Sequence, residues 1–99
     1  MIGKDWGRLL TGWPLRKTSR QVRECAIWAL GEMQSTIALE PIIFALKDSS
    51  SIIRWTAAEA LGKIKHLNAR KPLSDVLNAP RWLVRKYAHQ ALQNIKTIW

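Results

Sequence analysis

Few residues of this chain have the type and spacing that catalysis or metal binding requires. The two histidines, His66 and His89, are far apart, and neither is followed by a glutamate. The seven acidic residues are scattered, and no set of His, Cys, Asp and Glu shows metal-ligand spacing. We interpret His89 as a packed or end-face histidine rather than a ligand. The sequence therefore predicts no catalytic residue, no metal and no cofactor.

Cys25 is the only cysteine, and no histidine lies near it in the sequence to activate its thiol. It cannot form an internal disulfide, so a reducing cytoplasm is the expected location. We see no signal peptide at the N-terminus and no apolar run near the roughly 18 residues of a membrane span. These features predict a cytoplasmic, non-enzymatic protein of one domain that has no membrane partner.

Charge and tryptophan content are the unusual features of the composition. The formal net charge is +9 and the chain of 99 residues contains six tryptophans. A basic, tryptophan-rich surface can attract nucleic acid, an anionic membrane face or an acidic protein. The alternative interpretation is that the excess of lysine and arginine only keeps a small protein soluble.

One twelve-residue pattern occurs three times along the chain. It spans residues 22–33, 53–64 and 84–95, with a constant offset of 31 residues. Four of its twelve columns are identical in all copies: an arginine, two alanines and a leucine. A fixed period of this length is typical of solenoids built from helix pairs.

The pattern predicts an all-α chain with two helix pairs and one unpaired final helix. The predicted helices span residues 19–33, 36–47, 50–64, 68–78 and 80–96, and a short helix at 4–13 forms an N-terminal cap. We expect Gly31 to begin closing the first repeat helix and Pro80 to open the last one. Pro41 and Pro72 fall in register near the first turns of the partner helices. The predicted units are the cap at 1–17, repeats at 18–48 and 49–79, and a half repeat at 80–99.

The motif Val-Arg-x-x-Ala-x-x-Ala-Leu-Gly-x-Met/Ile, followed by a proline-containing second helix, resembles HEAT-like repeats. It is most similar to the short class found in phycobilin lyase subunits, over about residues 18–96. The resemblance implies a short α-solenoid of about two and a half repeats. It also implies a contact between Asp48 and Arg54, while Arg23 and Arg85 are left to reach Asp48 or Asp75 or to stay free.

The variable columns of the motif project away from the partner helix, and each repeat places an aromatic residue there. In artificial proteins of this family, the same columns carry the binding face. Tryptophan, tyrosine and arginine dominate interface hot spots, so these columns indicate a recognition surface. The alternative is that the rings pack over neighbouring repeats and extend the core. The predicted partner-binding residues are Arg20, Glu24, Trp28, Trp55, Glu59, Lys63, Trp82, Lys86 and Tyr87.

The last helix has no predicted partner, although a solenoid normally ends in a polar face or a capping helix. We expect an apolar end face and homodimerisation through it. A longer array or a tail that folds back would also cover such a face. The residues of this predicted end face are Leu92, Ile95, Ile98 and Trp99.

The sequence favours a non-catalytic scaffold that offers an aromatic and basic face to another protein. A first alternative is nucleic-acid binding, with tryptophan rings stacking on bases. A second alternative, which rests on the resemblance alone, is an accessory subunit of a bilin-lyase-like enzyme. The cations available for phosphate contacts are Arg16, Lys17, Arg20, Arg23, Arg81, Arg85 and Lys86.

Overall fold

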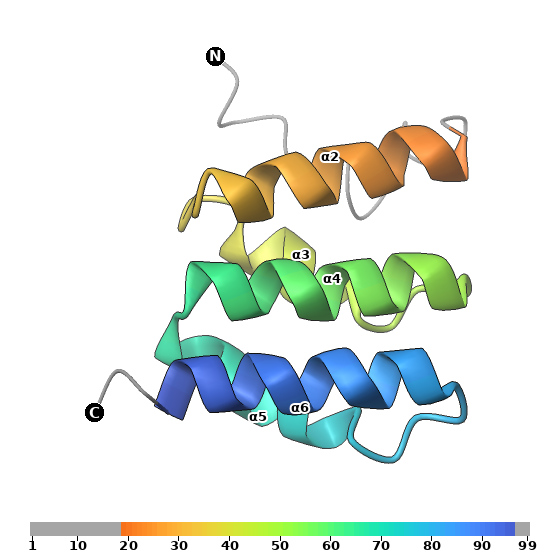
Figure 1. The fold of residues 1–99 in the computed structure, drawn as a ribbon. Coiled ribbons are helices and arrows are strands. Elements are labelled where there is room, and N and C mark those ends of the chain that lie inside the picture. Colours follow the sequence, from red (N-terminus) through yellow and green to blue (C-terminus); the bar gives the residue numbers. More distant parts are fainter. Residues whose placement is uncertain (1–18, 97–99) are drawn as a thin grey trace.

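The computed structural model describes residues 19–96, and every regular element in that range is a helix. Three long helices form the first layer: α2 (Arg20–Glu32), α4 (Ser51–Ile64) and α6 (Trp82–Lys96). Figure 1 shows them side by side and running in the same direction, each starting at the same end of the molecule. The three copies of the sequence motif therefore lie next to one another in space.

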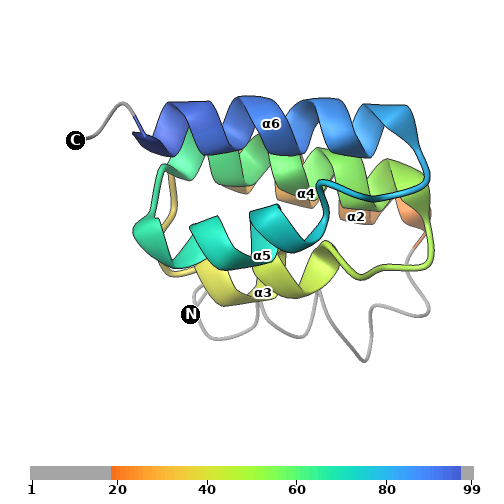
Figure 2. The same cartoon turned by 90° about the horizontal axis from the view of Figure 1, so that it is seen from below.

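Shorter helices form the second layer and return the chain to the starting end. They are α3 (Leu39–Ala45) and α5 (Arg70–Asp75), the latter preceded by the 3-10 turn η2 (Leu67–Ala69). Figure 2 shows α3 and α5 together on one side of the long-helix layer. This two-layer arrangement is a short all-α solenoid, as the sequence predicted. The predicted cap at residues 4–13 lies outside the described residues.

The partner helices are shorter than predicted, but their prolines fall where expected. Pro41 and Pro72 are each the third residue of their helix. Amide groups in the first turn have no intrahelical acceptor, so proline loses no hydrogen bond there. The prediction for Pro80 was wrong, because α6 begins two residues later, at Trp82.

Local side-chain and backbone chemistry sets the ends of the long helices. Ser19 caps α2, with its hydroxyl accepting a hydrogen bond from the Val22 amide at 3.3 Å. Gln34 and Lys65 have left-handed backbone angles, with φ of 52° and 58°, after the ends of α2 and α4. The turn away from each helix is therefore made by a non-glycine residue.

Gly31 does not close its helix, and that prediction was wrong. It is buried inside α2, where a Cβ atom would lie 2.8 Å from both Cα and Cβ of Ala60. In the next repeat, a Cβ on Gly62 would lie 3.0 Å from Cα and 3.1 Å from Cβ of Ala91. The two glycines thus allow neighbouring long helices to approach closely.

The repeated columns build the core, which runs between the two layers. Ala57, Ala60 and Leu61 of α4 are buried, and Leu30 and Ala91 occupy matching places on α2 and α6. Small alanines allow close helix approach, and the leucines fill the space between helices. The first and last apolar columns depart from this in the first repeat, since Val22 is 53% and Met33 68% exposed while their counterparts in the later repeats are buried.

Candidate partner-binding face

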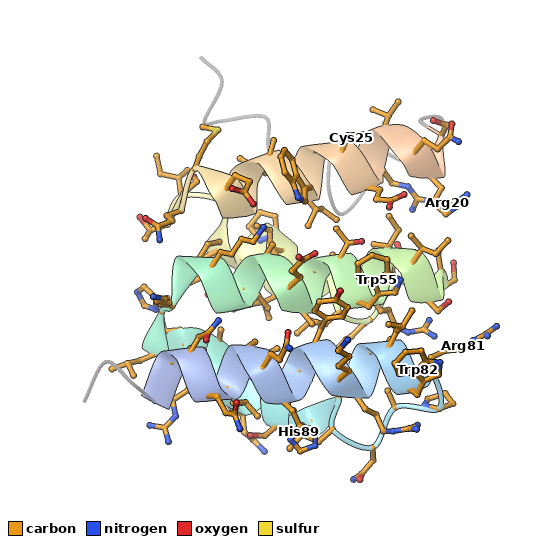
Figure 3. The ribbon with its side chains drawn as sticks, in the orientation of Figure 1. Arg20, Cys25, Trp55, Arg81, Trp82 and His89 are labelled. Atoms are coloured by element: carbon orange, nitrogen blue, oxygen red, sulfur yellow. The ribbon has the colours of Figure 1, made fainter. Side chains whose placement is uncertain are left out.

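The outer surface of α2, α4 and α6 carries four aromatic side chains that lie outside the repeated framework columns. Trp28 is 52% exposed and Trp82 is 62% exposed. Trp55 and Tyr87 are partly buried and stack with ring centroids 5.1 Å apart and an interplanar angle of 19°. In Figure 3, Trp55 and Trp82 lie over the ribbons of α4 and α6. Two rings are therefore exposed, as a recognition surface requires. The other two pack against each other between neighbouring repeats, as the alternative interpretation expected.

Lysine side chains lie against these rings. The Lys63 ammonium is 5.5 Å from the centre of the Trp28 ring, and the Lys86 ammonium is 5.9 Å from Trp82 and 5.7 Å from Tyr87. Such contacts place a cation over the negative face of an aromatic ring and contribute about 0.5–1 kcal/mol at exposed sites. Three of the four rings, those of Trp28, Trp82 and Tyr87, therefore have a lysine ammonium over them.

The predicted face carries acidic as well as basic side chains, and most of them form ion pairs. Glu24 lies beside Arg20 at 3.5 Å, and Lys63 forms ion pairs with both Glu32 and Glu59, at 3.9 Å for Glu59. Three carboxylates thus lie on α2 and α4. Exposed cations gather instead at the start of α6, where Arg81 and Lys86 flank Trp82.

A groove of about 400 Å³ lies between α2 and α4. Its walls carry two indole rings and two carboxylates, and among the described residues no lysine or arginine lines it. Its volume falls in the range of roughly 300–1,000 Å³ that is usual for ligand sites. The main residues of this groove, called the α2/α4 groove below, are Gln21, Glu24, Cys25, Trp28, Trp55 and Glu59.

A smaller depression of about 140 Å³ lies between α4 and α6. Glu59 also lines this depression, so the carboxylate belongs to both hollows of the face. Asn94 and Gly62 are joined across it by a hydrogen bond of 3.4 Å from the Asn94 amide to the Gly62 carbonyl. The other main lining residues are Lys63, Tyr87 and Gln90.

The arginine that recurs in every copy of the motif contacts a segment that connects two repeats. Arg54 donates to the carbonyl oxygens of Asp48 and Ser49 at 2.8 and 3.1 Å. Arg85 donates in the same way to Ala79 and Pro80, at 2.7 and 3.1 Å. These carbonyls lie between helices and lack helical partners, so the two arginines satisfy them.

The expected contact between Asp48 and Arg54 exists, but it uses the Asp48 main chain. The Asp48 carboxylate instead pairs with Arg23 at 3.2 Å and accepts the Ser50 amide at 2.9 Å. Asp75 pairs with Lys71 rather than with Arg85. The arginines therefore have structural roles, and they differ between the first repeat and the later ones.

We expect Arg85→Met to lower the free energy of unfolding by about 1.5–3 kcal/mol, because hydrogen bonds from a charged donor to two carbonyls are lost. Arg81→Met is the matched control, since the Arg81 side chain is exposed and a surface change costs about 0.5 kcal/mol or less. Urea unfolding followed by circular dichroism measures both. Equal midpoints for the two variants would contradict this role.

Two predicted orientations were wrong. Ile95 is fully buried and Leu92 packs against the core, so the described part of the predicted end face is covered within the chain. Ile98 and Trp99 lie outside the described residues. Thr56 occupies a variable column of the motif, which was expected to project outward, but it is buried, and its hydroxyl donates to the Ile52 carbonyl at 2.7 Å.

The large exposed hydrophobic residues gather at the opposite end of the solenoid from the predicted end face. Within residues 19–96, five of the seven such side chains belong to the first repeat. On α6, Trp82 is the only one among the described positions. The five are Val22, Trp28, Met33, Ile37 and Phe44.

The histidines and the cysteine, which were considered as catalytic or metal-binding residues, do not come together in the described structure. The His66 Nδ1 atom accepts the Asn68 amide at 3.1 Å, and His89 is exposed on the outer edge of α6 (Figure 3). Cys25 is exposed on α2. Across residues 19–96, no three His, Cys, Asp or Glu side chains come together as a metal site. None of the helices in that range is long and apolar enough to span a membrane.

A family model for HEAT repeats matches residues 13–93, which is most of the chain. This match and the parallel stack of helix pairs define the class of protein. The chain belongs to the HEAT-repeat family. Members of this family generally act as scaffolds for protein interactions. No curated protein matches the sequence.

Proposed function

We propose that this protein is a non-catalytic binding module whose protein partner docks on the face formed by α2, α4 and α6. The observation that carries the proposal is the placement of aromatic rings in columns that the solenoid does not need for packing. Trp28 and Trp82 keep more than half of their surface exposed, while the nearby framework residues Leu30 and Val84 are buried. Tryptophans left in this way supply large contact areas to a partner.

The alternative of nucleic-acid binding has less support on this face. Arg23 is paired with Asp48, Arg85 is held by two carbonyls, and Arg20 lies beside Glu24. Carboxylates on α2 and α4 would repel phosphates. The exposed pair Arg81 and Lys86 remains, and Arg16 and Lys17 lie outside the described residues. The bilin-lyase alternative is supported only by the sequence resemblance, and mixing the protein with a free bilin tests it by absorbance.

Affinity capture from the source cell tests the proposed face. We expect the double variant Trp28→Ala/Trp82→Ala to lose the partner retained by the wild type, with recovery falling at least tenfold. Removing two hot-spot side chains costs about 2 kcal/mol or more of binding free energy. Quantitative mass spectrometry of cross-linked captures, with and without nuclease, gives the measurement.

Phe44→Ala is the matched control for this capture. Phe44 is 56% exposed but lies on α3, in the other layer. The control should retain the partner at the wild-type level. A partner set that is unchanged in the double variant would contradict the proposed face, and capture that disappears with nuclease would favour nucleic acid instead.

A further inference from the structure

The α2/α4 groove is lined by two carboxylates, although the chain as a whole is basic. The chain carries a formal charge of +9, whereas the described residues lining the groove include Glu24 and Glu59 and no cation. Charges separated by more than about 8 Å are largely screened at physiological salt, so the groove is influenced mainly by its two carboxylates and by the neighbouring cations Arg20 and Lys63, which lie 3.5 Å from Glu24 and 3.9 Å from Glu59 but do not line it. The groove is therefore suited to a positively charged group.

Both carboxylates keep bonding capacity for such a group. The contact of Glu24 with Arg20 is long, at 3.5 Å, and engages one oxygen. Glu59 lies 3.9 Å from Lys63, which is beyond hydrogen-bond distance, and Lys63 is hydrogen-bonded to Glu32 instead. The side chains of Glu24 and Glu59 remain about one-third exposed. A ligand in the groove can thus be contacted from both helices.

The aromatic walls favour a flat cation. Trp28 and Trp55 come from neighbouring repeats, and Trp28 already holds the Lys63 ammonium over its ring at 5.5 Å. A guanidinium is planar, stacks on aromatic rings and is less strongly hydrated than an ammonium. It also donates paired hydrogen bonds to carboxylates.

We propose that the α2/α4 groove binds an arginine side chain of the partner protein. The guanidinium lies between Trp28 and Trp55 and pairs with Glu24 and Glu59. This inference rests on the proposed function, and it names the chemistry by which that face would recognise its partner: an arginine in an exposed segment. It places the specific contact at the junction of the first two repeats.

Titration with N-acetyl-arginine amide tests the inference on the purified protein. A ligand of this size binds at about millimolar affinity. We expect the indole N–H resonances of Trp28 and Trp55 to shift in two-dimensional NMR spectra, and the exposed Cys25 thiol in the groove wall to react more slowly with a maleimide. N-acetyl-citrulline amide, which has nearly the same shape without the charge, should shift neither resonance at the same concentration.

Matched variants separate the groove from the general charge of the protein. Glu24→Gln and Glu59→Gln should each weaken arginine binding about tenfold, because each removes a charged acceptor. Glu40→Gln, at an exposed position of α3 outside the groove, should leave it unchanged. Equal binding of the citrulline probe, unchanged affinity in both groove variants, or tighter binding of N-acetyl-lysine amide would overturn the proposal.

The outcomes distinguish this inference from the proposed function. If the Trp28→Ala/Trp82→Ala variant loses its partner but the arginine probe does not bind, the face is a docking surface and the arginine assignment is wrong. If the probe binds but the capture is unchanged in that variant, the proposed partner-binding face is wrong.

Discussion

Truncating Leu61 to alanine is expected to lower the free energy of unfolding by about 3–5 kcal/mol. Leu61 is fully buried on α4, the helix that contacts α2, α3 and α6. The loss combines the transfer free energy of the removed methyl groups with the cavity that remains. A chain of this length has a total stability of about 5–15 kcal/mol, so the variant should be near the limit of folding.

Leu67→Ala is the control for this experiment. Leu67 lies in η2 and is 43% exposed, so its truncation should cost less than about 1 kcal/mol. Urea unfolding monitored by circular dichroism gives both free energies. Similar losses in the two variants would show that Leu61 does not occupy the centre of the core.

Replacing Gly31 by valine is expected to cost about 3 kcal/mol. A Cβ at this position would lie 2.8 Å from the Cα of Ala60, so the backbones of α2 and α4 would have to separate. Overpacking of this kind costs about 1–3 kcal/mol, and the branched side chain of valine adds further bulk. Thermal unfolding should therefore begin at a markedly lower temperature than in the wild type.

Alanine substitutions at the two equivalent glycines give a finer comparison. Gly62→Ala should be nearly neutral, because a contact of 3.0 Å needs a small shift and alanine improves helix propensity by about 1 kcal/mol. Gly31→Ala meets a closer contact and should be destabilising by about 1 kcal/mol. Equal stability of the two variants would argue against the closer approach of α2 to α4.

The repeated columns made most of the fold predictable. Ala57, Ala60 and Leu61 recur with a constant period, and their burial follows from the packing of one repeat on the next. Proximity across repeats was also available from the sequence, because residues 31 apart lie side by side. Glu32 and Lys63 occupy the same column and form an ion pair across that distance.

The features that were missed depend on contacts between helices. Gly31 lies near a helix end, which in the sequence suggests a helix-terminating role. In the structure, glycine is needed there because a Cβ atom would clash with Ala60 on another helix. Ile95 lies near the end of the chain, yet α5 and α4 pack against α6 and bury it. Thr56 is small enough to fit between helices, with its hydroxyl satisfied by its own backbone.

The candidate face was predictable as a set of columns, but its internal pairings were not. Trp55 and Tyr87 stack although they come from adjacent columns, 32 residues apart. Composition favoured a basic surface because the charge of the whole chain is positive. The two carboxylates that line the α2/α4 groove come from different helices. Their proximity therefore depends on how the repeats pack against one another.

The position of Glu59 in the walls of two adjacent hollows has a thermodynamic consequence. A cation bound on one side neutralises the carboxylate toward the other side, so the two hollows cannot both use its full charge. Cationic ligands on either side of α4 would then bind with negative cooperativity. Linkage requires this penalty to be reciprocal, so each ligand weakens the other by the same factor.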